Sequence, residues 1–131
     1  MPAANESLRY FADDDDLTYT ANSAVTGCRF LGIKANKDSD GLLKLSHTSL
    51  TAGQSVVGVS AYDVASGARG LALRHGEVQV LAGEALAAGD DVYTTATGTA
   101  VKLATVVSGI RLGTCTTAAS NGALATILLT L

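Results

Sequence analysis

Large aromatic side chains are nearly missing from this sequence. It has no tryptophan, and two phenylalanines and four tyrosines are the whole aromatic content of 131 residues. Alanine, valine and leucine carry much of the apolar fraction instead, and small side chains lose little rotamer entropy when they pack. They favour thin, closely packed sheets over a large cavity built around a ligand, so no cofactor is expected.

Long hydrophobic runs and paired cysteine motifs are also missing. No apolar run approaches the roughly 20 residues that a membrane-spanning helix needs, so no membrane partner is expected. Cys28 and Cys115 have no metal-binding spacing and are too few for a disulfide scaffold. We expect both to be buried free thiols. The N-terminus lacks the basic and apolar regions of a signal peptide, which favours synthesis in a cytoplasm.

Basic residues are too sparse for a nucleic-acid surface. Nine Lys and Arg stand against twelve Asp and Glu, which gives a net charge of −3. The imbalance lies in residues 1–20, where Arg9 stands against Glu6 and the run Asp13–Asp16, while the remaining eight basic and seven acidic residues leave +1. Phosphate backbones require a dense basic footprint, so direct binding of nucleic acid is not expected.

The run Asp13–Asp16 predicts a solvated loop. Four adjacent like charges resist a helix interior or a paired strand. A calcium loop needs ligands at alternating positions, which contiguous aspartates do not supply. No metal site is therefore expected here.

Residues 1–19 are predicted to form an extended, flexible N-terminal arm. Apolar groups flank its acidic run, and an arm that carries aromatic groups into solvent usually has a surface on which to dock. We therefore expect the arm to contact a partner protein. The candidate contact residues are Leu8, Arg9, Tyr10, Phe11, Leu17 and Tyr19.

The body, residues 20–131, has the pattern of an all-β protein. Apolar or alternating segments recur about every ten residues with turn residues between them, which is typical of a small β-barrel or β-sandwich. Only Gly83–Gly89 favours a helix, and we interpret it as one short helical turn. The expected strands include 29–34, 42–47, 55–61, 68–74, 77–81, 90–95, 100–103, 109–115 and 123–129.

A weak internal repeat runs through the body. When Val57–Val59 is laid over Leu112–Thr114, the turn Ala65–Ala68 falls on Ser120–Ala123 without a gap. Upstream, Leu43–Leu45 resembles Val101–Leu103, Val25–Gly27 resembles Ala87–Gly89, and the first copy has a longer loop around Ser46–Gln54. The repeat predicts two related halves, each with a strand, a hairpin and a returning strand.

No constellation of reactive residues emerges. His47 and His75 lack metal spacing, and no nucleophile elbow accompanies them or Asp63. Asp90 and Asp91 are adjacent, so in a strand they would point to opposite faces. We expect no catalytic, metal-binding or cofactor-binding residue and no enzyme activity. An enzyme or small-ligand binder with a β-barrel body stays open as an alternative, and a deep pocket at either histidine or this aspartate pair would favour it.

Three segments carry a family resemblance. They are Val56–Gly67, Val78–Tyr93 and Gly109–Gly113, with their turn glycines at Gly58, Gly67 and Gly83. Together they resemble the capsid-cement, or head decoration, proteins of tailed bacteriophages over roughly residues 20–131. The acidic run of the arm is not part of that pattern, so the arm's role stays open.

The resemblance implies a structural protein of the virion. It implies a β-barrel or sandwich that binds the outer surface of the phage head and stabilises the mature shell. The implied partners are the major capsid protein, reached partly by strand addition from the arm, and two further copies in a homotrimer at three-fold and quasi-three-fold positions. Another phage structural role, such as a head-fibre base or a tail-associated barrel, is the alternative.

Overall fold

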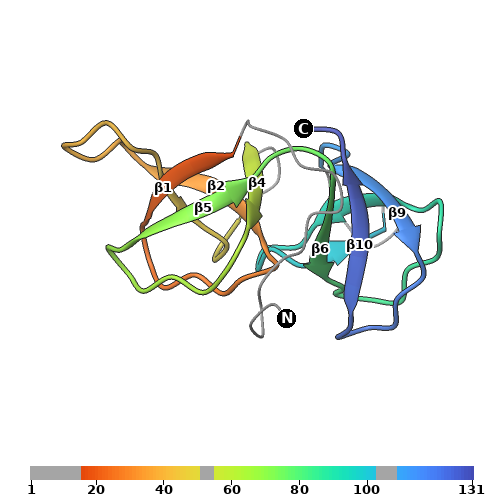
Figure 1. The fold of residues 1–131 in the computed structure, drawn as a ribbon. Coiled ribbons are helices and arrows are strands. Elements are labelled where there is room, and N and C mark those ends of the chain that lie inside the picture. Colours follow the sequence, from red (N-terminus) through yellow and green to blue (C-terminus); the bar gives the residue numbers. More distant parts are fainter. Residues whose placement is uncertain (1–15, 51–54, 103–108) are drawn as a thin grey trace.

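The protein folds into two packed β units that follow one another along the chain (Figure 1). The computed structural model describes residues 16–50, 55–102 and 109–131. Among them there is no helix, which confirms the predicted all-β class. The expected arm lies largely outside the described residues. Its predicted end at residue 19 falls inside the first strand, so residues 17–19 belong to the folded body.

The first unit is a closed five-stranded barrel, here called the first barrel. Its order around the barrel is β1-β3-β2-β4-β5, with β1 and β3 parallel and the other neighbours antiparallel. The strands are β1 (Leu17–Ala21), β2 (Phe30–Ala35), β3 (Lys44–Ser46), β4 (Val56–Ser60) and β5 (Arg69–Leu73).

The second unit is a five-stranded sheet with the order β6-β10-β9-β7-β8. A parallel bridge between Ala82 and Ala100 joins its two edges, where β1 and β3 pair in the first barrel. The strands are β6 (Glu77–Leu81), β7 (Asp91–Thr94), β8 (Ala100–Val101), β9 (Gly113–Thr117) and β10 (Leu124–Leu129).

The predicted helical turn at Gly83–Gly89 is not present. Leu86 instead forms a β-bridge with Ala119, and the two residues exchange backbone hydrogen bonds of 2.8 and 2.9 Å. Gly89 then turns the chain with φ +94°. Pairing with a distant strand satisfies the backbone here, so the short local helical preference does not prevail.

The predicted internal repeat is confirmed by the backbone hydrogen bonds. Strands β1 to β5 correspond in order and pairing to β6 to β10. The Ala21 N–H donates to the Ala68 oxygen at 2.9 Å, and the Ala82 N–H donates to the Ala123 oxygen at 2.8 Å. Val25 and Val64 exchange two such bonds, as Leu86 and Ala119 do. Cys28, with φ +62°, occupies the position of Gly89.

The alignment of the two copies differs from the prediction upstream of β4. Val64 corresponds to Ala119, the expected shift of 55 residues, but Val25 corresponds to Leu86, a shift of 61. Leu45 likewise corresponds to Ala100 rather than to Leu103, because both occupy the parallel bridge. The extra six residues of the first copy therefore lie between β2 and β3, not in the expected loop around Ser46–Gln54.

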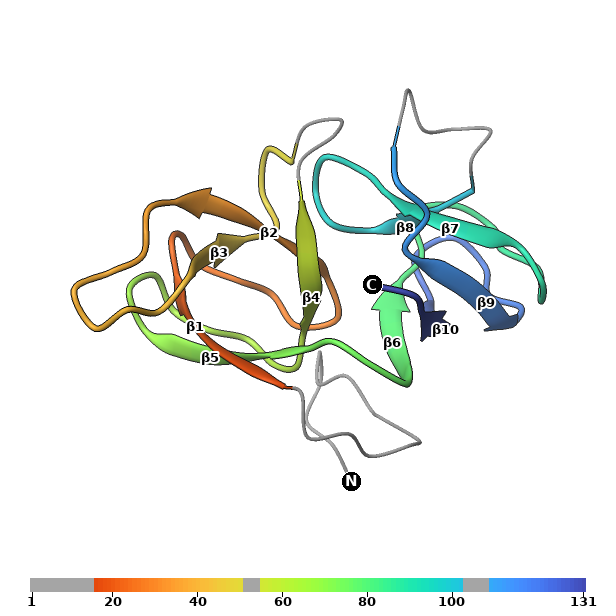
Figure 2. The same ribbon diagram turned by 90° about the horizontal axis from the view of Figure 1, so that it is seen from above.

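Two apolar clusters hold the fold together. One fills the first barrel and includes Tyr19, Leu31, Leu45 and Ala72. The other unites the interior of the second unit with residues of β2, β4 and β5, so the two units share a core. In Figure 2, β4 lies on the side of the first barrel that faces the second unit. Apolar burial of this kind is the main force that joins them.

Tyr19 provides a stability prediction. Its side chain is fully buried opposite Gly70, whose missing Cβ leaves the ring its space. Its hydroxyl has no hydrogen-bond partner among the described residues, and burial raises its pKa, with a smaller contribution from Tyr62. Because a buried unpaired hydroxyl costs on the order of 1 kcal/mol, we expect Tyr19→Phe to increase the free energy of unfolding by about that amount. Urea unfolding measures this, and a loss of stability would contradict it.

Candidate interaction surfaces

The structure divides the six predicted contact residues. Leu8, Arg9, Tyr10 and Phe11 lie outside the described residues. Leu17 is half-buried at the start of β1 and packs against the first-barrel cluster. Tyr19 is fully buried in that cluster, so its side chain is not available to a partner. The alternation that makes Leu17–Thr20 a strand turns Tyr19 toward the barrel interior.

His47 links the two units. Its Nε2 accepts a hydrogen bond from the Thr26 N–H at 3.1 Å, and its Nδ1 lies 3.1 Å from the Thr97 oxygen. The ring is therefore the neutral tautomer that donates from Nδ1. Burial is the main cause of its lowered pKa, the Thr97 hydrogen bond opposes this in part, and Arg29 lowers the pKa by a smaller amount. Both ring nitrogens are engaged by backbone, which is a structural arrangement.

The adjacent carboxylates Asp90 and Asp91 serve separate contacts. Asp90 accepts a hydrogen bond from the Ala87 N–H at 2.8 Å, whereas Asp91 forms an ion pair of 2.8 Å with Arg111. Asp63 accepts a hydrogen bond from the Gly27 N–H. Asp91 begins β7 and Asp90 precedes that strand, and each described contact of these three carboxylates stabilises a turn or a strand end.

Both cysteines are buried free thiols, as predicted. Cys115 donates a hydrogen bond to the Thr117 oxygen, and burial raises the pKa of its thiol. In the part of the chain that the structure describes, no group of three or more His, Cys, Asp and Glu residues could hold a metal ion. No helix there is long and apolar enough to cross a bilayer.

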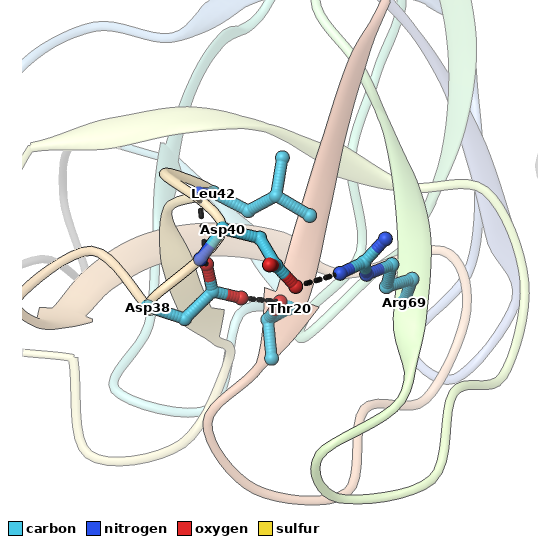
Figure 3. A network of polar contacts seen from close by, with 5 residues as sticks. All are labelled: Thr20, Asp38, Asp40, Leu42 and Arg69. Atoms are coloured by element: carbon cyan, nitrogen blue, oxygen red, sulfur yellow. Dashed lines mark hydrogen bonds and ion pairs between the residues drawn. The ribbon is translucent and has the colours of Figure 1, made fainter.

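An ordered polar turn projects from the first barrel between β2 and β3 (Figure 3). Asp38 organises it, because its carboxylate accepts hydrogen bonds from the N–H groups of Asp40 and Leu42 and from the Thr20 hydroxyl. The Thr20 hydroxyl is the largest cause of a lowered Asp38 pKa. Asp40 pairs with Arg69 of β5. These contacts fix the exposed turn to β1 and β5.

The outer face of β10 exposes apolar side chains that we did not predict as a contact surface. Leu124 and Leu128 are 41% and 45% exposed, and the half-buried Thr126 stands between them on the same face. On β9, Thr114 lies opposite Leu128. The sequence contains part of this signal, because Leu124 and Leu128 alternate with the buried positions of the same strand and so must lie on its outer face.

Comparison with known proteins finds two similarities, and each covers most of the chain. The family model described as phage cement protein matches residues 11–131. No curated protein sequence matches the chain. A solved structure, the head fiber gp8.5 N base in bacteriophage phi29, is similar with a TM-score of 0.67 and 26% identity. The match covers 88% of this chain and 92% of that one.

The fold and these two similarities show that the chain is a structural protein of the phage capsid. It belongs to the phage cement protein family. The predicted resemblance is confirmed. Location in the virion and binding to the capsid follow from this membership.

Proposed function

We propose that this protein binds the outer surface of the phage head through the major capsid protein and stabilises the mature shell as a homotrimer without enzymatic activity. The family match over residues 11–131 is the observation that carries the proposal. It is supported by the polar residues of the described part of the chain, such as His47, Asp90 and Asp91, whose hydrogen bonds and ion pairs hold turns and strand ends together. Synthesis in the host cytoplasm is part of the same proposal.

The physical basis of shell stabilisation is mass action. A ligand that binds the assembled lattice but not its separated subunits stabilises the lattice by its binding free energy. A trimer attaches at several points, so modest contacts on each copy add to a strong attachment. Cryo-electron microscopy of the purified virion tests the proposal. Density for both β units on the outside of the shell is expected, and their absence there would refute it.

We also propose that the N-terminal arm contributes to attachment. The family match begins at residue 11, within the arm, and the first barrel closes from Leu17 onward. Removal of residues 1–15 should therefore leave the unfolding transition nearly unchanged but weaken capsid binding by about tenfold, which corresponds to about 1.4 kcal/mol. Binding of the purified protein to undecorated capsids, followed by sedimentation, measures this.

Paired substitutions separate apolar from charged contributions of the arm. Tyr10→Ala with Phe11→Ala should weaken attachment more than Asp13 to Asp16 replaced by asparagine, because aromatic groups contribute more to docked interfaces than solvated charges. Unchanged capsid occupancy after removal of residues 1–15 would contradict the docking role. The reverse order of the two sets would assign that role to charge.

A second candidate function is the base of a head fibre. The similarity to the head fiber base of bacteriophage phi29, at 26% identity over most of both chains, favours it specifically. Both functions place the protein on the head, and electron micrographs distinguish them. Compact knobs on the shell would support the cement function, whereas filaments rising from the same density would support a fibre base.

A further inference from the structure

The two units carry nearly identical turns in corresponding hairpins. We name residues 38–42, between β2 and β3, the first-barrel turn, and residues 95–99, between β7 and β8, the second-unit turn. In each, the first residue's N–H donates to the oxygen of the fifth at 2.9 Å, and the glycine N–H donates back to the first at 3.0 and 3.2 Å. The glycines, Gly41 and Gly98, have φ of +81° and +82°.

The second-unit turn is bound by the first barrel through its backbone oxygens. The Gly98 oxygen accepts a hydrogen bond from the Phe30 N–H at 2.8 Å, and the Ala96 oxygen accepts one from the Leu50 N–H at 2.8 Å. The approach is close, because a Cβ on Gly98 would lie 2.8 Å from the Phe30 oxygen. This turn is therefore part of the interface between the two units.

Beside this contact, the first barrel presents a row of three cross-strand neighbours, Phe30, Val59 and Leu73. Phe30 and Val59 are fully buried and Leu73 nearly so, in the cluster shared with the second unit. The bound turn and this apolar row together form the receiving face of the first barrel. The second unit of the same chain covers this face.

Each of these two elements has a counterpart that is uncovered, the row on the second unit and the turn on the first barrel. Its corresponding row is Asp91, Thr114 and Leu128, which are paired in the same register across β7, β9 and β10. Asp91 and Leu128 are exposed. At the other end of the molecule, the first-barrel turn has its residues 39–41 exposed, and a Cβ on Gly41 would meet no atom within 4 Å.

From this internal correspondence, we propose that the first-barrel turn of one copy docks on the row Asp91–Thr114–Leu128 of a second copy. The contact repeats between chains the one that joins the two units within a chain. Figures 1 and 2 show the β2–β3 connection at the end of the first barrel away from the second unit, and β9 at the opposite end of the molecule. Successive copies therefore meet head to tail.

The chemistry of the uncovered row suits a contact between separate chains. Asp91 replaces the buried Phe30, and Arg111 binds both Asp91 and the Thr114 hydroxyl, so two of the three residues in the row have polar partners. Non-obligate interfaces have this mixed composition. Within the chain, His47 contacts the oxygen of Thr97. In the proposed contact, Lys102 stands at the position of His47, and the acidic Asp40 stands at the position of Thr97. Opposite charges would thus meet.

Head-to-tail contacts form closed rings when the rotation between copies allows it, and a cyclic trimer uses only such contacts. The inference therefore deepens the homotrimer of the proposed function and rests on it for the number of copies. It does not depend on capsid binding, because the contact lies between copies of this chain alone.

Sedimentation equilibrium of the full chain tests the proposal. The wild type should associate in a concentration-dependent way, and Leu128→Asp should lower the association constant at least tenfold. Tyr62→Asp is the matched control, because Tyr62 is 42% exposed and lies outside both docking elements. On the turn side, Ser39→Tyr should weaken association, whereas Ser66→Tyr, in the exposed turn before β5, should not. A monomer at every concentration up to about 1 mM, or full association of Leu128→Asp, would overturn the proposal.

Cross-linking identifies the contact directly. The double variant Ser39→Cys and Leu128→Cys, treated with a short bismaleimide, should form covalent oligomers larger than dimers, because each copy contributes one thiol to each neighbour. The variant Ser66→Cys with Leu128→Cys is the control, and equal yields from both would refute the assignment. Capsid binding is measured separately. If the purified protein self-associates as expected but does not bind capsids, only the proposed function is refuted.

Discussion

Replacing Gly113 by alanine is expected to lower the free energy of unfolding by about 3 kcal/mol, at the upper end of the range for overpacked interiors. A Cβ at Gly113 would lie 2.4 Å from the Leu128 oxygen and 2.8 Å from the Ile127 Cγ2. The nearest obstacle is backbone in the neighbouring strand β10, which cannot move aside as a flexible side-chain end can. Urea unfolding at fixed protein concentration measures the change.

Its repeat partner and an open glycine provide the comparison. A Cβ at Gly58 would lie 2.8 Å from the Leu73 oxygen, so Gly58→Ala should cost somewhat less, about 2 kcal/mol. Gly122→Ala meets no atom within 4 Å, but its φ of +85° is unfavourable for alanine, so it should cost about 1 kcal/mol. If Gly113→Ala were no more harmful than Gly122→Ala, close strand packing would not be the reason for the glycine.

Replacing His47 by alanine is expected to cost about 2 kcal/mol, because two hydrogen bonds are lost and each is worth about 1 kcal/mol. The substitution leaves the Thr26 N–H and the Thr97 oxygen without the ring that joins them. The second-unit turn then loses one of its attachments to the first barrel. Amide hydrogen exchange at Phe30 and Leu50, which donate to the same turn, should accelerate. His75→Ala is the control and should leave both amides protected.

The same histidine predicts a loss of stability in mild acid. Because burial lowers the His47 pKa in the folded state, the unfolded chain takes up the proton first, with a pKa of about 6.5. The stabilisation is therefore full at neutral pH and is lost as the pH falls from about 6.5 to the folded pKa. The ring is only half-buried, so solvent screening reduces the effect to less than about 1 kcal/mol. His47→Gln should remove this slope of the unfolding free energy between pH 7 and 5, and retention of the slope would assign it to another group.

Asp38 should act in a separate and more acidic range. Its pKa is lowered in the folded state, chiefly by the Thr20 hydroxyl and the Leu42 N–H. The stability it contributes is present above the unfolded aspartate pKa of about 3.9 and is lost as the pH falls below that value. The two groups therefore titrate in windows that a pH series can resolve.

Local pattern predicted the strands well because burial alternates along them. Glu77–Leu81 shows this in both sequence and structure, whereas in Leu124–Leu129 only the burial alternates. The repeat was visible wherever turn length was conserved, as between Gly58 and Leu73. The six-residue difference between β2 and β3 was misplaced, since apolar triplets such as Leu43–Leu45 fit several alignments equally well. The correct alignment of the two copies follows from which strands pair, and a short stretch of sequence does not specify its pairing partner.

The candidate surfaces were less predictable than the fold. The predicted arm includes Tyr19, although Leu17–Thr20 has the composition of a strand, and the structure places Tyr19 in β1 with its side chain inside the barrel. Leu128 and Thr114 could not be recognised as a contact row. Their significance comes from the buried counterparts Leu73 and Val59 across three-dimensional pairing, which no linear spacing reveals.

The two halves of the repeat present corresponding faces with different side chains, Phe30, Val59 and Leu73 in the first barrel and Asp91, Thr114 and Leu128 in the second unit. If each subunit had a single barrel, every subunit would expose the apolar row that joins the two units here. Such subunits would tend to associate head to tail into open filaments. With both units on one chain, Phe30 is buried between them, whereas its counterpart Asp91 is exposed and keeps the corresponding face polar. Because both units lie on one chain, the partner of the buried face is always present at high local concentration, whereas the proposed contact of the exposed face would depend on protein concentration.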